Sequence, residues 1–387
     1  MKKICYVVTI PLTIRAFFIP QLRYLAEHGF DVTVVCSDDG SIAEELGDPI
    51  HFHGIEIPRG VSVAGSLRAI SQLRAFFREQ KFDLIQYSTP NAALYAAIAA
   101  KQAGCPVRNY HLMGNRFLGS SGAGRQFLKT MDQIACSLST SIECVSRSNL
   151  EQGAEAGVYP REKATVVFNG SSGGVDRQRF DIRRREAWRQ ELRQELGYQE
   201  TDFIFGFVGR ITRDKGINEL LEAFFRLEDG SRLFLIGGIE DDGTLDPDLW
   251  KKAADSPDVL IHAPTTEVEK YYALIDVLVL PSYREGFGNV VIEAAAMGTP
   301  AIVSEIPGPV DAILAGETAL TVKPKDVEAL TAAMKEIRQM DVARMGMAAA
   351  DFAEDAFDSE TLCEKILERK RTLLGMEQSR EAEMIGV

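Results

Sequence analysis

Short apolar runs alternate with amphipathic stretches along almost the whole chain, and this alternation restricts the fold more than any other feature. In the first half, apolar runs at residues 3–9, 31–36, 82–87, 107–111, 142–145 and 165–168 alternate with helical patterns at 15–28, 92–102, 124–137 and 147–156. Runs without a polar face are typical of parallel strands, which lie buried and need helical crossovers between them. We therefore predict an α/β fold, with a parallel sheet covered by helices.

The alternation stops once and then restarts, which predicts two domains. The interruption is Asn-Gly-Ser-Ser-Gly-Gly at residues 169–174, which we interpret as a flexible connector. Beyond a charged helix at 183–196, strands are expected at 203–208, 232–236, 259–262, 277–280 and 301–303, with helices at 217–225, 289–297, 326–338 and 361–374. The predicted domains are 1–174 and 175–356, and a last helix at 357–375 is expected to pack back on the first domain.

Basic residues are concentrated in the first half of a chain whose net charge is −13. Residues 59–130 contain 10 Lys and Arg against 2 Asp and Glu, a net of +8. This excess favours an anionic partner, either a phosphorylated ligand or a lipid surface, although an ordinary solvated face explains it equally well. Nucleic acid is not expected as a partner, because no stacking motif accompanies the charge.

The six cysteines form no CxxC pair and most lie in apolar runs, which predicts reduced, buried thiols in a cytoplasmic protein. The apolar run after Lys2-Lys3 is interrupted by Pro11 and Arg15, unlike a secretory signal. No apolar stretch reaches the ~18 residues that a membrane span needs.

The strongest local motif is PSYREGFGN at residues 281–289, where a predicted strand gives way to a glycine-rich turn and a helix. Backbone N–H groups at such a helix start suit a phosphate, although Asn289 as an N-cap residue would explain the turn without a ligand. Glu285 at the mouth of the turn could accept hydrogen bonds from ligand hydroxyls. Glu293 lies in apolar surroundings, where an unused charge is costly.

A second motif, FVGRITRDKG at residues 207–216, also follows a predicted strand. The strand ends at Gly209, and two cations, Arg210 and Lys215, come before the next helix. A guanidinium and an ammonium group together can hold a diphosphate without a metal ion. A surface loop with ordinary charges is the alternative.

FVGRITRDKG together with LPSYREGFGNVVIEAAAMGTP resembles the retaining GT-B glycosyltransferases of the glycosyltransferase family 4 type, strongest over residues 201–315. The family's Glu-x7-Glu hallmark is matched by Glu285 and Glu293. The resemblance implies two Rossmann-like domains facing a central cleft, with the acceptor on the first and a nucleotide-sugar on the second. Within the family, the chain is most similar to enzymes that build lipid-linked bacterial surface polysaccharides.

The family's roles carry over to matching positions as implications of that resemblance. Arg210 and Lys215 would hold the donor diphosphate, Glu285 the donor sugar, and Glu293 the ribose hydroxyls. Further donor contacts would come from Gly209 and from the turn formed by Phe287, Gly288, Asn289 and Val290. No metal ion or other cofactor is expected, and a UDP-sugar is the expected donor.

Weaker candidates lie elsewhere in the chain. His111 follows a predicted strand and resembles a family histidine near the acceptor and donor sugar, but the sequence favours a structural histidine there. The first loop lacks the glycine pair that family members carry near the acceptor. The DxD spelling at residues 246–248 is interpreted as a solvated turn, and His51 and His53 lack a third metal ligand.

The resulting hypothesis is a retaining glycosyltransferase that moves a hexose or N-acetylhexosamine to a lipid-linked saccharide at the cytoplasmic face of the membrane. Aromatic and arginine residues at helical spacing in 66–78, with Arg116, Phe117, Arg125 and Lys129, are compatible with a membrane-surface patch or with a core-facing helix. The alternatives are a UDP-sugar epimerase of the same fold and a non-catalytic nucleotide-sugar-binding subunit.

Overall fold

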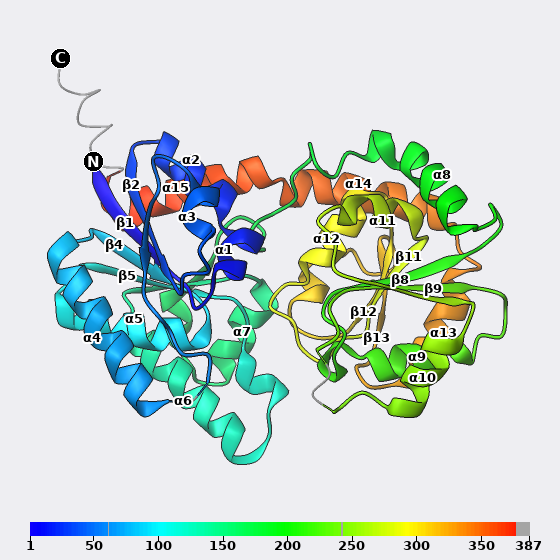
Figure 1. The fold of residues 1–387 in the computed structure, drawn as a ribbon, viewed down its shortest axis with the longest axis horizontal. Coiled ribbons are helices and arrows are strands. Elements are labelled where there is room, and N and C mark those ends of the chain that lie inside the picture. Colours follow the sequence, from blue (N-terminus) through cyan, green and yellow to red (C-terminus); the bar gives the residue numbers. More distant parts are fainter. Residues whose placement is uncertain (61, 241–242, 377–387) are drawn as a thin grey trace. The chain divides into compact units, whose positions relative to one another are not determined.

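The computed structural model describes residues 1–60, 62–240 and 243–376. The chain divides into two compact units, each a parallel sheet with helices on both faces (Figure 1). Unit 1 comprises Met1–Gly173 with Glu360–Val387, and unit 2 comprises Gly174–Ser359. The predicted domain ends, residues 174 and 356, lie one and three residues from the observed ends of the two units, residues 173 and 359.

Unit 1 contains a seven-stranded sheet whose paired strands all run parallel, in the order β3-β2-β1-β4-β5-β6-β7. The strands are β1 (Lys2–Val7), β2 (Phe30–Cys36), β3 (His51–Gly54), β4 (Leu84–Tyr87), β5 (Val107–Leu112), β6 (Ser141–Cys144) and β7 (Ala164–Val166). The strand order reverses between β1 and β4, which is the arrangement of a doubly wound Rossmann-type sheet.

Helices cover both faces of this sheet. They are α1 (Pro11–Phe17), α2 (Ile19–Glu27), α3 (Ile42–Leu46), α4 (Val63–Gln80), α5 (Pro90–Ala103), α6 (Gly122–Leu138), α7 (Arg147–Glu155) and α15 (Ser359–Leu373), with 3-10 turns η1 (Arg116–Gly119) and η2 (Arg161–Lys163). The single helix predicted at 15–28 was wrong, because Phe18 separates α1 from α2. Pro20 lies in the first turn of α2, where its missing N–H costs no helical hydrogen bond. In the described part of the chain, no helix combines the length and apolar character needed to cross a membrane.

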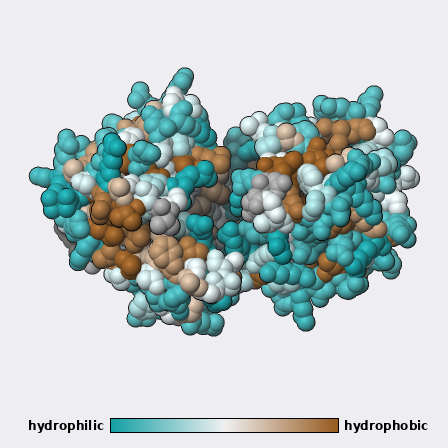
Figure 2. All heavy atoms as spheres, turned by 60° about the horizontal axis from the view of Figure 1, so that its bottom comes forward, coloured by the Kyte–Doolittle hydropathy of each residue, from teal (hydrophilic) through white to brown (hydrophobic). Residues whose placement is uncertain are grey.

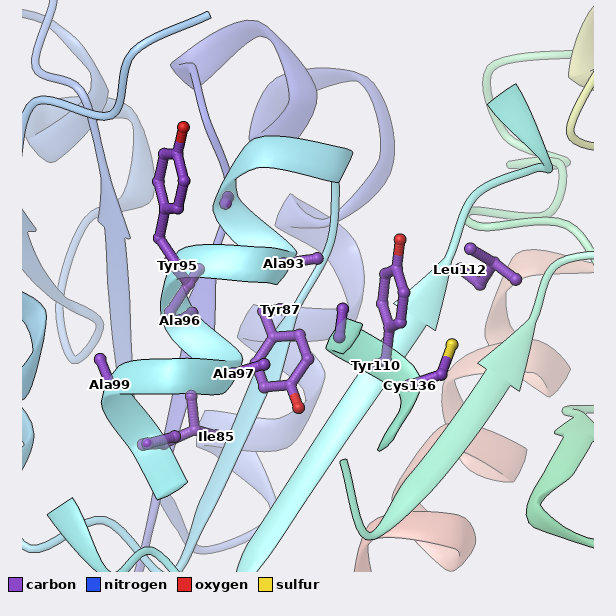
Figure 3. Packing of buried hydrophobic residues seen from close by; sticks show 14 of the residues in the cluster. Ile85, Tyr87, Ala93, Tyr95, Ala96, Ala97, Ala99, Tyr110, Leu112 and Cys136 are labelled. Atoms are coloured by element: carbon purple, nitrogen blue, oxygen red, sulfur yellow. The ribbon is translucent and has the colours of Figure 1, made fainter. Parts of the chain in front are cut away.

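The face covered by α4, α5 and α6 packs through small side chains (Figure 3). Alanines of α5, including Ala93, Ala96 and Ala97, are fully buried against the sheet and let the helix approach closely. Tyr87 and Tyr110 fill the space beside them, and the Tyr110 hydroxyl donates a 3.0 Å hydrogen bond to Asp132. The six cysteines are buried and none forms a disulfide.

Unit 2 repeats the same topology with six parallel strands, in the order β10-β9-β8-β11-β12-β13. The strands are β8 (Ile204–Val208), β9 (Arg232–Ile236), β10 (Val259–His262), β11 (Val277–Leu280), β12 (Ala301–Ser304) and β13 (Ala319–Val322). The helices are α8 (Arg185–Leu196), α9 (Ile217–Phe225), α10 (Pro247–Asp255), α11 (Val268–Leu274), α12 (Asn289–Ala296), α13 (Val327–Ile337) and α14 (Val342–Phe357), with 3-10 turns η3 (Ile182–Arg184), η4 (Arg213–Lys215) and η5 (Pro309–Asp311). The prediction missed β13, α10, α11 and α14.

The interpretation of residues 169–174 as a flexible connector was wrong. Ser171 and Ser172 are buried, the Ser171 N–H donates to the Val145 carbonyl at 2.7 Å, and Gln21 Nε2 donates to the Ser172 carbonyl at 2.9 Å. Buried backbone groups of a Gly/Ser-rich segment must find such partners, and here unit 1 supplies them. The chain leaves unit 1 only at Gly174.

The second face of the unit 1 sheet carries a buried polar group under α15. Lys370 Nζ donates to Gln86 Oε1 of β4 at 2.6 Å and to Glu143 Oε2 of β6 at 2.7 Å. Lys370 and Glu143 are 1% and 3% exposed, so both charges have lost nearly all contact with water. Burial lowers the pKa of Lys370. Burial also raises the pKa of Glu143, but the charge and hydrogen bond of Lys370, together with Arg369, outweigh it and hold that pKa below its usual range. The pair fixes the position of α15 on the sheet.

Replacing Lys370 by Met should destabilise unit 1 by about 3–5 kcal/mol, because the Glu143 carboxylate would stay buried without a counter-charge. Far-UV circular dichroism reports on both units. Tryptophan fluorescence reports on unit 2, because Trp188 and Trp250 both lie there. The dichroism transition in urea should shift to lower denaturant while the fluorescence transition shifts less. A Lys370→Met/Glu143→Leu double variant should recover most of the loss. Unchanged dichroism in the single variant would contradict the role of the pair.

Candidate functional site

Both predicted motifs of unit 2 lie at the point where its strand order reverses. β8 and β11 are neighbours in the sheet, so the loops that follow them leave the same edge side by side. The Tyr283 N–H donates to the Asp214 carbonyl at 2.9 Å and joins the two loops directly. Open α/β sheets bind ligands outside the carboxyl ends of their strands at such a reversal.

One glycine permits this close approach of backbone, and a second one shapes the turn before α12. Gly216 has φ +74°, and a Cβ there would lie 2.2 Å from the carbonyl oxygen of Pro281 in the other loop. Gly288 has φ +95°, a conformation that other residues adopt only with strain. Gly216 therefore allows the loop after β8 to approach the loop after β11 closely.

Lys215 and Glu285 form the centre of the candidate site. Lys215 Nζ lies 2.6 Å from Glu285 Oε1, and the Ser282 hydroxyl donates to the same oxygen at 2.8 Å. The two charged side chains are only 17% and 13% exposed, which limits screening by water. The family resemblance implied a diphosphate contact for Lys215 and a sugar contact for Glu285, and the structure brings the two side chains together in one ion pair.

A second ion pair lies in the same two loops as the first, and the sequence analysis did not predict it. Arg284 Nη2 lies 2.8 Å from Asp214 Oδ2, and the Thr212 hydroxyl donates to Asp214 Oδ1 at 2.6 Å. Burial raises the pKa of Asp214, but the Thr212 hydrogen bond and the nearby cations outweigh it and hold that pKa below its usual range. The signal was present in the sequence, since Asp214 precedes Lys215 and Arg284 precedes Glu285, giving two adjacent pairs of opposite charge.

Arg210 occupies a more open position in the same loop. Its Nη1 lies 2.8 Å from Glu240 Oε2, and the two side chains are 51% and 58% exposed. An exposed pair of this kind contributes little to stability, so separating it costs little free energy. Gly209, directly before it, donates its N–H to the Ile236 carbonyl of β9 at 2.9 Å.

The turn that opens α12 differs from the prediction by one residue. Gly288 is the N-cap residue, and Asn289 already belongs to the helix, so the prediction of Asn289 as the N-cap was wrong. The φ of +95° at Gly288 sets the chain direction from which the helix starts. Phe287, next to it, is buried and packs edge-on against Phe357 at a ring separation of 5.3 Å. The N–H groups at the start of an α-helix have no intrahelical partners, which gives this end a positive potential.

Glu293 lies on the second turn of α12, with Val290 one turn before it. Tyr272 of α11 donates its hydroxyl to Glu293 Oε2 at 2.9 Å. Burial raises the pKa of Glu293 despite this hydrogen bond and the charge of Arg179. Ionised Glu293 would therefore gain from further hydroxyl donors.

His111 lies in unit 1, at the end of β5. Its Nε2 is 3.2 Å from the Ser172 hydroxyl, and its ring meets Phe18 edge-on at 5.5 Å. Burial lowers the pKa of His111 to about 4, so the imidazole is neutral at pH 7. His111, Ser172, Gln86 and Lys370 contribute to the lining of a cavity of about 10 Å³, close to the room that one water molecule needs.

The remaining candidates have structural roles. Asp246 accepts hydrogen bonds from the N–H groups of Asp248 and Leu249, both at 3.0 Å, and caps α10. The DxD spelling thus begins a helix rather than a solvated turn, while residues 241–242 of the preceding loop lie outside the described residues. His53 stacks on Phe76 at 3.9 Å. Within the described ranges, no three His, Cys, Asp or Glu side chains are grouped so that they could hold a metal ion.

Comparison with known proteins gives consistent matches over both units. The model "Glycosyltransferase Family 4" matches residues 21–172, and "Glycosyl transferases group 1" matches residues 189–352. The chain is 28% identical over 378 residues to the capsular polysaccharide biosynthesis glycosyltransferase CapM of Staphylococcus aureus, covering 96% of this chain and 98% of that protein. It is 24% identical to the UDP-Gal:alpha-D-GlcNAc-diphosphoundecaprenol alpha-1,3-galactosyltransferase of Escherichia coli, covering 79% of this chain and 80% of that protein.

Among solved structures, that of HepE from Anabaena in complex with UDP is similar to this chain. The TM-score is 0.76 at 20% identity, and the match covers 96% of this chain and 100% of that one. At this level of identity the likeness establishes a shared fold.

The burial of His111 predicts a specific pH dependence of stability. Between pH 6.5 and about 4, the unfolded chain binds a proton at this histidine that the folded chain does not, so stability should fall as the pH falls. Across that interval the free energy of unfolding of the wild type should drop by up to about 3 kcal/mol more than that of His111→Asn. Urea unfolding at pH 7.5, 6, 5 and 4.5 measures the difference. Parallel curves would show that His111 titrates normally.

Proposed function

Because this chain belongs to the group 1 glycosyltransferases of the GT-B fold, we propose that it transfers a sugar from UDP to a lipid-linked saccharide, with retention of configuration. The transferred sugar would be a hexose or an N-acetylhexosamine, and the product would serve bacterial surface polysaccharide assembly. The observation that carries the proposal is the partly buried Lys215–Glu285 pair, which lies beside the start of α12 at the strand-order reversal of unit 2.

Lys215, Arg210 and the first N–H groups of α12 would bind the donor diphosphate. Breaking the bond between the anomeric carbon and the phosphate oxygen leaves negative charge on that diphosphate. Fixed donors aimed at developing charge typically contribute about 10²–10³ each in rate. Arg210 is suited to binding the diphosphate, because its present partner Glu240 is exposed and phosphate oxygens can take its place.

Glu285 and Glu293 would bind hydroxyl groups at the two ends of the donor. Lys215 and Ser282 orient the Glu285 carboxylate, which would accept from the hydroxyls of the sugar. Glu293 would accept hydrogen bonds from the ribose hydroxyls. Together with the Tyr272 hydroxyl, these would stabilise the ionised carboxylate, which burial disfavours. Backbone groups of Gly209, Phe287, Gly288, Asn289 and Val290 would complete the contacts.

His111 would contribute from unit 1 as a neutral imidazole. A neutral ring can donate from one nitrogen and accept at the other, which suits hydroxyl groups of a sugar. Ser172 holds its Nε2 in place, so His111 would position a hydroxyl rather than exchange protons at neutral pH.

The names of two relatives support a lipid-linked saccharide as the acceptor. CapM is a capsular polysaccharide biosynthesis enzyme, and the Escherichia coli galactosyltransferase acts on a sugar joined to a diphosphate-linked undecaprenol. An acceptor of this kind would bring the protein to the cytoplasmic face of the membrane as a peripheral protein, in keeping with the basic residues of 59–130.

A UDP-sugar epimerase and a non-catalytic nucleotide-sugar-binding subunit remain the alternatives. An epimerase converts its UDP-sugar without an acceptor, so product analysis in the absence of acceptor separates it from a transferase. A binding subunit would bind UDP-sugar and transfer it to no acceptor. The membership of the chain in a transferase family favours the first proposal over both.

Removing the central charges should abolish most transfer. We expect Lys215→Ala and Glu285→Gln to lower kcat by about 10²–10³, because each removes a group aimed at the donor. Initial rates with a panel of UDP- and GDP-sugars and a lipid-linked acceptor measure the effect. Lys335→Ala, which changes an exposed lysine on α13, is the control and should match the wild type. Wild-type kcat in Glu285→Gln, with dichroism confirming the fold, would contradict the site assignment.

Transfer should not depend on a divalent metal ion. The cations Lys215 and Arg210 would neutralise the leaving diphosphate, so dialysis against EDTA should leave the rate within about twofold of the untreated protein. Rates before and after chelation, and after adding back Mg²⁺ or Mn²⁺, test this. A loss of more than about tenfold that Mn²⁺ restores would overturn it.

A further inference from the structure

An apolar groove of about 500 Å³ runs along one face of unit 1. Its floor is α5, which packs against both α4 and α6, and its walls come from those two helices. Figure 2, which brings this side forward, shows a brown area on unit 1. Val63, Leu67 and Phe127 line the groove and are 75%, 64% and 52% exposed. The volume is within the range of about 300–1,000 Å³ that small-molecule sites occupy.

Exposed apolar side chains on this scale are unusual for a face that meets only water. Ile134 adds to the exposed lining, and Leu94 and Ile98 of α5 form the partly buried floor. A contiguous apolar surface rimmed by polar residues marks a place where another apolar group binds. The hollow shape favours an elongated hydrocarbon over a flat surface.

The rim of the groove is basic. Two arginines, Arg59 and Arg116, belong to its lining, and both are exposed. Among the described residues, Arg59 and Arg116 make no ion pair with a carboxylate, whereas Lys2, Arg15 and Arg161 of the same unit do. An apolar channel with unpaired cations at its edge complements a hydrocarbon chain that carries an anionic head.

One end of the groove lies at the ligand-binding edge of the sheet. Asn91 follows the carboxyl end of β4, and Arg116 follows that of β5. Asn91 Nδ2 donates to the Pro58 carbonyl at 2.7 Å and holds the loop that carries Arg59 against α5. A molecule whose tail filled the groove would therefore place its polar head at the edge where parallel α/β sheets bind ligands.

We infer that this groove binds the hydrocarbon chain of the lipid-linked acceptor, with its phosphate groups near Arg59 and Arg116. The inference rests on the proposed function and adds a site for the lipid to it. Contact with the chain would make the length of the lipid, as well as the attached sugar, a determinant of which acceptor is used.

Binding of a soluble probe tests the groove without relying on transfer. The probe is a C20 isoprenyl monophosphate below its critical micelle concentration, with a C5 isoprenyl phosphate and inorganic phosphate as short-chain references. Leu67→Asp and Phe127→Asp should weaken C20 binding about tenfold or more, because a carboxylate in the channel must be desolvated by the chain. Met347→Asp, at a 63% exposed methionine of unit 2, is the matched control and should bind the probe as the wild type does.

Three results would overturn the inference. The first is unchanged C20 binding in both groove variants, and the second is equal affinity of the wild type for inorganic phosphate and for the C20 probe. The third is that the groove variants lose binding to phosphatidylglycerol vesicles but not to the C20 probe. The last result would make the face a bilayer contact. In transfer assays, the groove variants should raise KM for a long-chain acceptor and leave KM for the UDP-sugar unchanged. If the wild type transferred nothing but the C20 probe still bound in the groove, the proposed function would fail and the lipid site would stand.

Discussion

The reversal of strand order between β8 and β11 determines where charge can gather in unit 2. Parallel strands send all their carboxyl ends to one edge, and at a reversal the connections leave toward opposite faces, so two loops meet without a helix between them. Lys215 comes from one loop and Glu285 from the other, and their ion pair exists only because β8 and β11 are neighbours. Gly216 makes the same contact sterically possible through its missing side chain.

Unit 1 uses the same topology for a different kind of polar group. Its sheet is apolar on the face under α4 to α6, and on the other face it carries Gln86, His111 and Glu143 under a helix from the far end of the chain. Burying the ion pair of Lys370 with Glu143 costs desolvation free energy, so the pair adds little net stability. Its contribution is to hold α15 at one position on the sheet. His111, whose pKa burial lowers, lies in the wall of the same small cavity.

The sequence predicted the fold and the family, both of which were confirmed, because alternation and two contiguous motifs are local signals. It placed Lys215 and Glu285 at strand ends correctly but could not show that they pair, since their contact depends on which strands are neighbours. The error at residues 169–174 has a similar origin: Gly and Ser indicate flexibility until buried partners such as Gln21 and Val145 are known. Helix α14 was missed although its N-cap, Asp341, is a typical start signal.

The position of α15 has a consequence for synthesis on the ribosome. Unit 1 is made almost entirely before unit 2, yet the helix that covers one face of its sheet, and the lysine that neutralises Glu143, come after Gly174–Ser359. At about 5–20 residues per second, the nascent unit waits on the order of 10–40 s for them. During that time Leu84, Tyr6 and their neighbours lack the cover of Leu362 and Ile366, and Glu143 lacks its counter-charge, so the emerging chain presents part of this sheet face to chaperones.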